Sequence, residues 1–148
     1  MLQYCEREII SLNFTSCKKL DNEALKMIAE SPKCQQLAHL DLSFCRLFTN
    51  SGLLEIAKNC KSLKSLSLYG SCFTLYDINK KSAYDLANVI PYLGNLEELN
   101  IGDMAPSYYF EAHFELLAKH CPKITKIALK HRNLATIEPL IQNCKNVF

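Results

Sequence analysis

The chain has no tryptophan, only four glycines and no long apolar run. Four glycines leave little material for a phosphate-binding loop, and the G-x-x-x-x-G-K-[ST], G-x-G-x-x-G and G-x-S-x-G motifs are all missing. No apolar stretch approaches the roughly 18 residues that a membrane-spanning helix requires. The N-terminal stretch, MLQYCEREII, has acidic residues where a signal peptide would have its apolar core. We therefore expect a chain located in the cytoplasm or nucleus that binds neither nucleotides nor membranes.

Charge of one sign is also scarce, because the formal net charge is only +2 and the lysines and arginines are spread along the sequence. A nucleic-acid interface usually requires a concentrated basic patch, so a nucleic-acid partner is not expected. What the sequence does have is apolar material, with 49% hydrophobic residues in 148 positions. That is enough for one well-buried core, and we expect a single folded unit.

The apolar residues recur with a fixed spacing that is clearest between Cys34 and Cys60. Leu37, Leu40 and Leu42 follow an L-x-x-L-x-L pattern, which is typical of a short strand with one buried face. A second apolar series, Leu53, Leu54, Ile56 and Ala57, then has helical spacing and ends at Cys60. The strand-like pattern returns along the chain, with repeats starting near residues 9, 37, 63, 96 and 124.

This stretch resembles the cysteine-containing leucine-rich repeat of F-box/LRR proteins, a repeat also found in proteins similar to the mitotic-exit antagonists. The matching positions are Cys34, Leu37, Leu40, Leu42, Cys45, Thr49, Gly52, Leu53, Ile56, Ala57 and Cys60. The resemblance and the spacing together predict an α/β fold, a right-handed leucine-rich repeat solenoid with a parallel sheet on its concave face and helices on its convex face. Residues 1–148 would form one such domain of about five repeats, apparently cut within a repeat at both ends.

Several local features follow from the same pattern. We expect a helix over residues 21–30 that buries Leu25, Ile28 and Ala29, with Asp21 as its N-cap and Thr49 in the same role one repeat later. The third repeat is longer than its neighbours, which predicts an inserted loop after Cys72 followed by an inward-facing series. That series is Leu86, Ala87 and Ile90, and a sixth strand is expected to begin at Val147.

The eight cysteines fall on repeat positions rather than in metal-binding pairs, because the sequence has no C-x-x-C spacing. Cys17 and Cys45 each lie three residues after the last apolar residue of a strand. Neighbouring repeats stack about 4.8 Å apart, so successive cysteines would lie within disulfide reach. We expect reduced thiols, no metal site and no cofactor. Four cysteines are predicted to be buried, and each lies three residues before the first apolar residue of a strand pattern: Cys34, Cys60, Cys121 and Cys144.

Alternate strand residues point away from the core, and these positions define the candidate binding surface. From the first predicted strand to the last, the residues of this surface change from small and neutral to basic. Tyr69 is the one aromatic residue that the alternation assigns to the surface. Lys130 and Arg132 are the expected contacts for an acidic or phosphorylated segment of a protein partner. The predicted protein-binding residues are His39, Asp41, Tyr69, Glu98, Lys126, Lys130 and Arg132.

Catalysis is not expected, because His39 and Asp41 would face the open surface while the cysteines would face the core. The resemblance implies instead the substrate-recognition repeats of an F-box type ubiquitin ligase subunit, whose adaptor would bind a separate F-box. The alternative is a free-standing leucine-rich repeat protein that binds and inhibits a partner without an F-box. A ribonuclease-inhibitor-like or innate-immune receptor fragment is a third reading, which the uneven repeat lengths fit less well.

Overall fold

The computed structural model describes residues 7–71, 86–102 and 110–128. Several sequence-based predictions fall outside these residues: the inserted loop after Cys72, the sixth strand at Val147, the burial of Cys144, and the binding residues Lys130 and Arg132. The division of the chain into repeats also stays a prediction.

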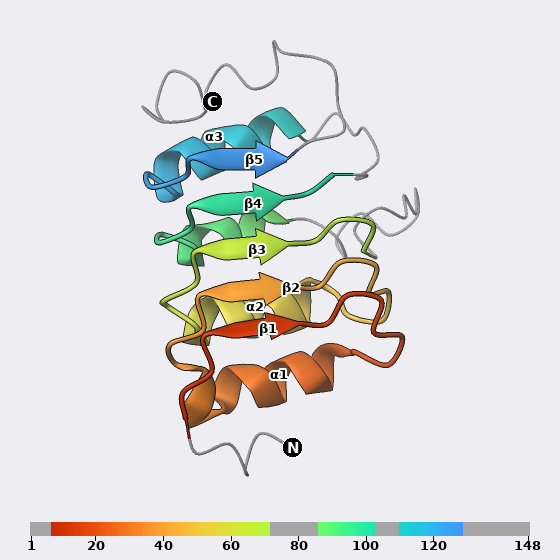
Figure 1. The fold of residues 1–148 in the computed structure, drawn as a ribbon. Coiled ribbons are helices and arrows are strands. Elements are labelled where there is room, and N and C mark those ends of the chain that lie inside the picture. Colours follow the sequence, from red (N-terminus) through yellow and green to blue (C-terminus); the bar gives the residue numbers. More distant parts are fainter. Residues whose placement is uncertain (1–6, 72–85, 103–109, 129–148) are drawn as a thin grey trace.

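A five-stranded parallel sheet organises the described residues (Figure 1). The strands follow one another in the sheet in their sequence order, and each pairs in parallel with the next. Each has three residues, with an apolar side chain at its centre. The strands are β1 (Ser11–Asn13), β2 (His39–Asp41), β3 (Ser65–Ser67), β4 (Glu98–Asn100) and β5 (Lys126–Ala128).

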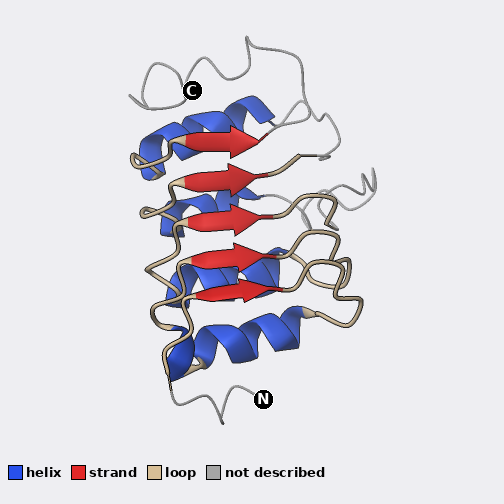
Figure 2. Ribbon diagram, viewed as in Figure 1, coloured by secondary structure: helices blue, strands red, loops and turns tan. Residues whose placement is uncertain are grey.

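The helical segments connect these strands and lie on one face of the sheet, whereas the other face, here called the open face, carries none of the described helices (Figure 2). The predicted α/β class with a parallel sheet is therefore confirmed. The helical segments are α1 (Asn22–Glu30), η2 (Pro32–Cys34), α2 (Asn50–Asn59), η4 (Leu86–Asn88), η5 (Ile90–Tyr92) and α3 (Phe110–His120). In the part of the chain that the structure describes, none of them is long and apolar enough to cross a bilayer.

The first two α-helices begin where the sequence predicts. The Asp21 side chain accepts a hydrogen bond from the Ala24 N–H, and the Thr49 side chain accepts one from the Ser51 N–H. Each bond satisfies a backbone donor that a helix start leaves without an intrahelical partner. The buried face of α1 consists of Leu25, Ile28 and Ala29, as predicted.

The third helical region differs from the prediction. The apolar series after the insertion forms two short 3-10 helices, and its predicted inward-facing residue Ala87 is not buried. A 3-10 helix has three residues per turn, so the buried positions are Leu86, Val89 and Ile90, while Ala87 is only half-buried. Pro91 has no N–H to donate within a helix and stands in the first turn of η5, which is compatible with a short helix beginning there.

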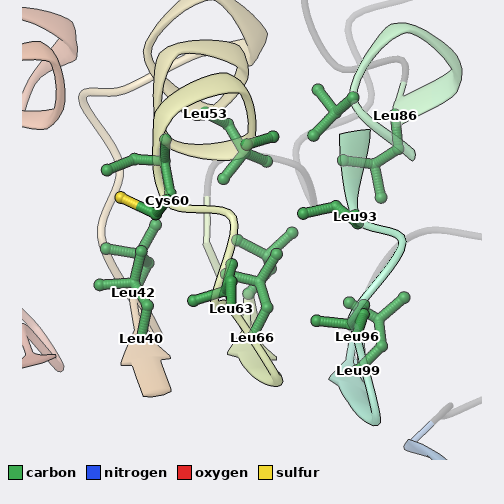
Figure 3. Close-up of a cluster of buried hydrophobic side chains, with 14 of the residues drawn as sticks. Leu40, Leu42, Leu53, Cys60, Leu63, Leu66, Leu86, Leu93, Leu96 and Leu99 are labelled. Carbon is green, nitrogen blue, oxygen red and sulfur yellow. The ribbon is translucent and has the colours of Figure 1, made fainter. Parts of the chain in front are cut away.

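The core lies between the sheet and the helices, where leucines from the strands meet side chains from the helical segments (Figure 3). Leu40, Leu66 and Leu99, at the centres of successive strands, are each at most 2% exposed, so the sheet faces the helices through a continuous apolar layer. The prediction of buried thiols at Cys34, Cys60 and Cys121 is confirmed. Burial is the largest cause that raises the pKa of the Cys60 thiol, to about 11.

Candidate functional site

The open face presents its side chains in two straight rows, because the strands pair without any shift in register. The first row holds the first residue of each strand: Ser11, His39, Ser65, Glu98 and Lys126. The second row holds the third residue: Asn13, Asp41, Ser67, Asn100 and Ala128. The sequence prediction that these positions point away from the core is correct for both rows, whose members are exposed or half-buried.

The first row is polar and exposed at most positions. Glu98 accepts a hydrogen bond from the Ser65 hydroxyl, with 3.4 Å between Oγ and Oε2, and its Oε1 lies 4.0 Å from the Lys126 Nζ. Both side chains of that ion pair are more than half exposed, so solvent screens their attraction. Glu98 therefore offsets part of the positive charge of Lys126. His39 belongs to the same row but lies two strands away from Glu98.

The second row is largely used by the protein itself. The Asp41 carboxylate accepts a hydrogen bond from the Ser43 N–H at 2.8 Å, and Asn13 and Asn100 make the equivalent bond to the N–H two residues further on. Such bonds stabilise the turn that follows each strand. Asp41 is only half-buried, but one of its carboxylate oxygens already has a backbone partner. Its role is thus partly structural.

An aromatic pair lies where the second and third strands end. The rings of Phe44 and Tyr69 meet edge to face, with 5.2 Å between their centroids and 82° between their planes. Phe44 is 44% exposed and Tyr69 is half-buried. The Phe44 N–H donates to the Tyr69 carbonyl at 2.8 Å, which ties the two backbones together beneath the rings. Two large rings are thereby held in fixed positions at the edge of a polar surface.

Two glycines make room for this pair. A Cβ at Gly70 would lie 2.6 Å from two ring carbons of Phe44, and a Cβ at Gly102 would lie 2.8 Å from the Tyr69 ring. Gly70 also has a φ of +59°, a conformation that disfavours other residues. Each ring therefore packs over a glycine of the next strand connection, and a side chain at either glycine would displace it.

Phe44 is the residue that the sequence analysis missed. Strand alternation stops at the turn, where Phe44 itself adopts a φ of +58°, so its side-chain direction does not follow the period of two. The sequence feature that could have indicated an outward ring at Phe44 is Gly70, a residue without a side chain at the corresponding place one repeat later. Ser43, two residues after Asp41, is also withdrawn from solvent, because it is 6% exposed and its hydroxyl lies 2.8 Å from that of Ser67.

The opposite ends of the strands carry a shallow groove of about 460 Å³. Its lining includes the exposed Ile10 and the half-buried Ser62, whose hydroxyl donates to Gln36 at 3.3 Å. The groove precedes the strands and the aromatic pair follows them, so the two features occupy different edges of the sheet.

Within residues 7–71, 86–102 and 110–128, no three histidine, cysteine or acidic side chains gather in a way that could hold a metal ion.

Comparison with known proteins finds similarity both in sequence and in structure. No family model matches the chain. It is 29% identical over 124 residues to the F-box/LRR-repeat protein 4 of Bos taurus, which covers 84% of this chain and 19% of that protein. The fold is similar to the tropomodulin C-terminal domain of Caenorhabditis elegans, with a TM-score of 0.68 and 11% identity over 98% of this chain and 87% of that domain. These similarities support a leucine-rich-repeat-like fold. The chain spans about a fifth of the length of the curated relative it matches.

Proposed function

We propose that this chain is a leucine-rich repeat solenoid that binds a protein partner through the open face of its sheet. The observation that carries this proposal is the aromatic pair of the exposed Phe44 and the half-buried Tyr69, held at the edge of a polar row. Binding energy at protein interfaces is concentrated in a few anchors, and tyrosine is among the residues enriched there. Rigid rings lose little conformational freedom when a partner covers them.

The rows beside the pair would supply the polar contacts. His39, Ser65 and Glu98 stand in register across three strands and can offer donors and acceptors to a partner's backbone or side chains. Lys126 stands at the last position of this row. The basic residues Lys130 and Arg132 follow it in the sequence, and we propose them as contacts for an acidic or phosphorylated segment. In this proposal the aromatic pair anchors the partner and the polar rows select it.

The binding surface can be tested by capture of partners from a cell lysate with Tyr69→Ala. We expect the change to release at least half of a captured partner, because it removes one ring of the anchor and leaves Phe44 without its edge-to-face contact. The matched control is Tyr92→Ala. Tyr92 is 42% exposed and lies on the helix side of the sheet, where the Lys61 Nζ is 5.0 Å from its ring centre.

Thermal unfolding of both variants should show comparable stability, so that loss of capture reports on contact rather than on folding. If Tyr92→Ala releases the partners while Tyr69→Ala retains them, the helix side is the binding surface and the assignment to the open face is wrong.

The more specific proposal is that the chain recognises substrates for an F-box type ubiquitin ligase. It rests on the resemblance to F-box/LRR proteins and on the 29% identity to one of them. The alternative is a free-standing repeat protein that binds and blocks its partner. Both readings describe a binding protein without catalytic activity of its own, and we propose that it acts in the cytoplasm or nucleus.

Immunopurification of the native protein with an antibody against this chain separates the two readings. A ligase subunit should bring down a cullin and its adaptor in amounts comparable to its own. Recovery of the partner that Tyr69→Ala releases, without cullin or adaptor, would support the free-standing reading and contradict the ligase one.

A further inference from the structure

Cys17 and Cys45 occupy equivalent places in two successive turns. Both turns contain a residue with positive φ just before the cysteine, Ser16 at 62° and Phe44 at 58°. Backbone bonds continue the strand register through these turns, since the Ser16 N–H donates to the Ser43 carbonyl at 2.8 Å. Neighbouring parallel backbones lie about 4.8 Å apart, and disulfide-bonded residues usually have Cα atoms about 4.4 to 6.8 Å apart. The two cysteines therefore hold equivalent positions in adjacent turns, where this general spacing lies within the range that a disulfide spans.

Their polar contacts bring the two residues to the same atom. The Cys45 thiol donates to the Phe14 carbonyl, with 3.0 Å between Sγ and the oxygen. The Cys17 N–H donates to that same carbonyl at 2.8 Å. The Cys17 backbone N–H also lies close enough to the Cys45 sulfur to interact with it. One carbonyl thus gathers the Cys45 sulfur and the Cys17 backbone into a single small cluster.

The two thiols differ in access to solvent. Cys45 is fully buried, whereas Cys17 is partly exposed. Burial is the largest cause that raises the pKa of the Cys45 thiol, and the nearby Asp41 carboxylate acts in the same direction. A dissolved oxidant has better access to Cys17 than to Cys45, and the raised pKa of Cys45 disfavours its own direct reaction with that oxidant.

We propose that Cys17 and Cys45 are a redox pair that closes a disulfide between adjacent turns when the protein meets a peroxide. Hydrogen peroxide transfers one oxygen to the Cys17 thiol, which gives a sulfenic acid and releases one water. The Cys45 sulfur then attacks the Cys17 sulfur and forms the S–S bond. The sulfenic hydroxyl leaves with the proton of the Cys45 thiol as a second water. The two thiols together lose two protons and two electrons, and the peroxide takes up both as it is reduced to two waters.

A second pair in the same protein provides an internal control. Cys34 and Cys60 each lie five residues before a strand, β2 and β3 respectively, and the two are close enough for Cys34 to influence the pKa of Cys60. Both are buried, with 0% and 2% exposure. If access to solvent decides which pair reacts, this second pair should resist peroxide under conditions that oxidise the first.

The experiment is a peroxide titration of the folded chain, followed by alkylation of the remaining thiols, digestion with trypsin and mass spectrometry. Cleavage after Arg7, Lys18, Lys33 and Arg46 gives a peptide of residues 8–18 with one cysteine and a peptide of residues 34–46 with two. We expect these peptides to be joined with the loss of two hydrogen atoms, and fragmentation should place the bond at Cys45 rather than Cys34. The melting midpoint should rise by several degrees on oxidation and return after treatment with dithiothreitol.

Two variants keep the test independent of folding defects. Cys17→Ser should abolish the joined peptides. Cys45→Ala should leave a sulfenic acid at Cys17 that dimedone traps, with circular dichroism as the check on folding. The proposal is overturned if wild-type Cys17 accumulates as sulfenic acid without a bond to Cys45, if the Cys34 and Cys60 pair is oxidised equally fast, or if the bond appears only in urea.

Discussion

Cys45→Asp is expected to lower the free energy of unfolding by about 3 kcal/mol or more, a large share of the total for a domain of this size. The Cys45 side chain has no exposed surface, so the introduced carboxylate would be buried. It would also stand against the Phe14 carbonyl, which accepts a hydrogen bond from the Cys45 thiol at 3.0 Å. An ionised carboxylate has no proton to donate to that oxygen, and the Asp41 carboxylate nearby adds repulsion.

Urea unfolding measures this loss, and pH provides a second readout. Burial raises the pKa of the introduced carboxyl group above its value in the unfolded chain. The loss of stability should therefore shrink as the pH falls toward about 4 and be smallest below that value, where the group is protonated in both states. Cys17→Asp is the matched control, because Cys17 holds the equivalent place in the preceding turn but is partly exposed. Equal losses for the two variants would show that burial at Cys45 is not the cause.

Gly52→Ala is expected to lower the free energy of unfolding by about 1 to 2 kcal/mol, although alanine is ordinarily the better helix residue. Gly52 lies in the first turn of α2, directly against the first turn of α1. A Cβ there would lie 2.6 Å from the Asn22 Oδ1 and 3.0 Å from the Asn22 Cα. The Asn22 side chain can rotate, but its Cα cannot move without shifting α1.

The same substitution would disturb a hydrogen-bonded junction between the two helix starts. The Asn22 Oδ1 accepts bonds from the Thr49 N–H at 2.8 Å and the Gly52 N–H at 3.2 Å. Chemical denaturation should be compared with that of Gly94→Ala, since a Cβ at Gly94 would meet only the His120 carbonyl, at an ordinary 3.7 Å. We expect Gly94→Ala to be nearly neutral. A stabilising Gly52→Ala would contradict the close approach of α1 and α2 at this point.

The strands and the first two α-helices could be predicted because their signals are local. Alternation of apolar and polar residues fixes which face of a strand is buried, and Asp21 and Thr49 mark the helix starts through bonds to N–H groups within a few residues. The buried leucines of the sheet and the outward direction of His39 and Glu98 follow from that alternation alone. The third helical region could not be predicted in the same way, because apolar spacing does not distinguish a 3-10 turn from an α-helical one over so few residues.

By itself, the sequence determined the parallel order of the strands, the buried cysteines and the polar character of the open face, all of which depend on spacing along the chain. The tertiary structure decided which side chains meet between turns. It packed Phe44 edge to face against Tyr69, with Gly70 and Gly102 beneath the rings, and it brought Asn22 against Gly52. The physical reason is that these contacts join residues about one repeat apart or depend on a turn with positive φ. Their geometry exists only once successive turns have stacked in register.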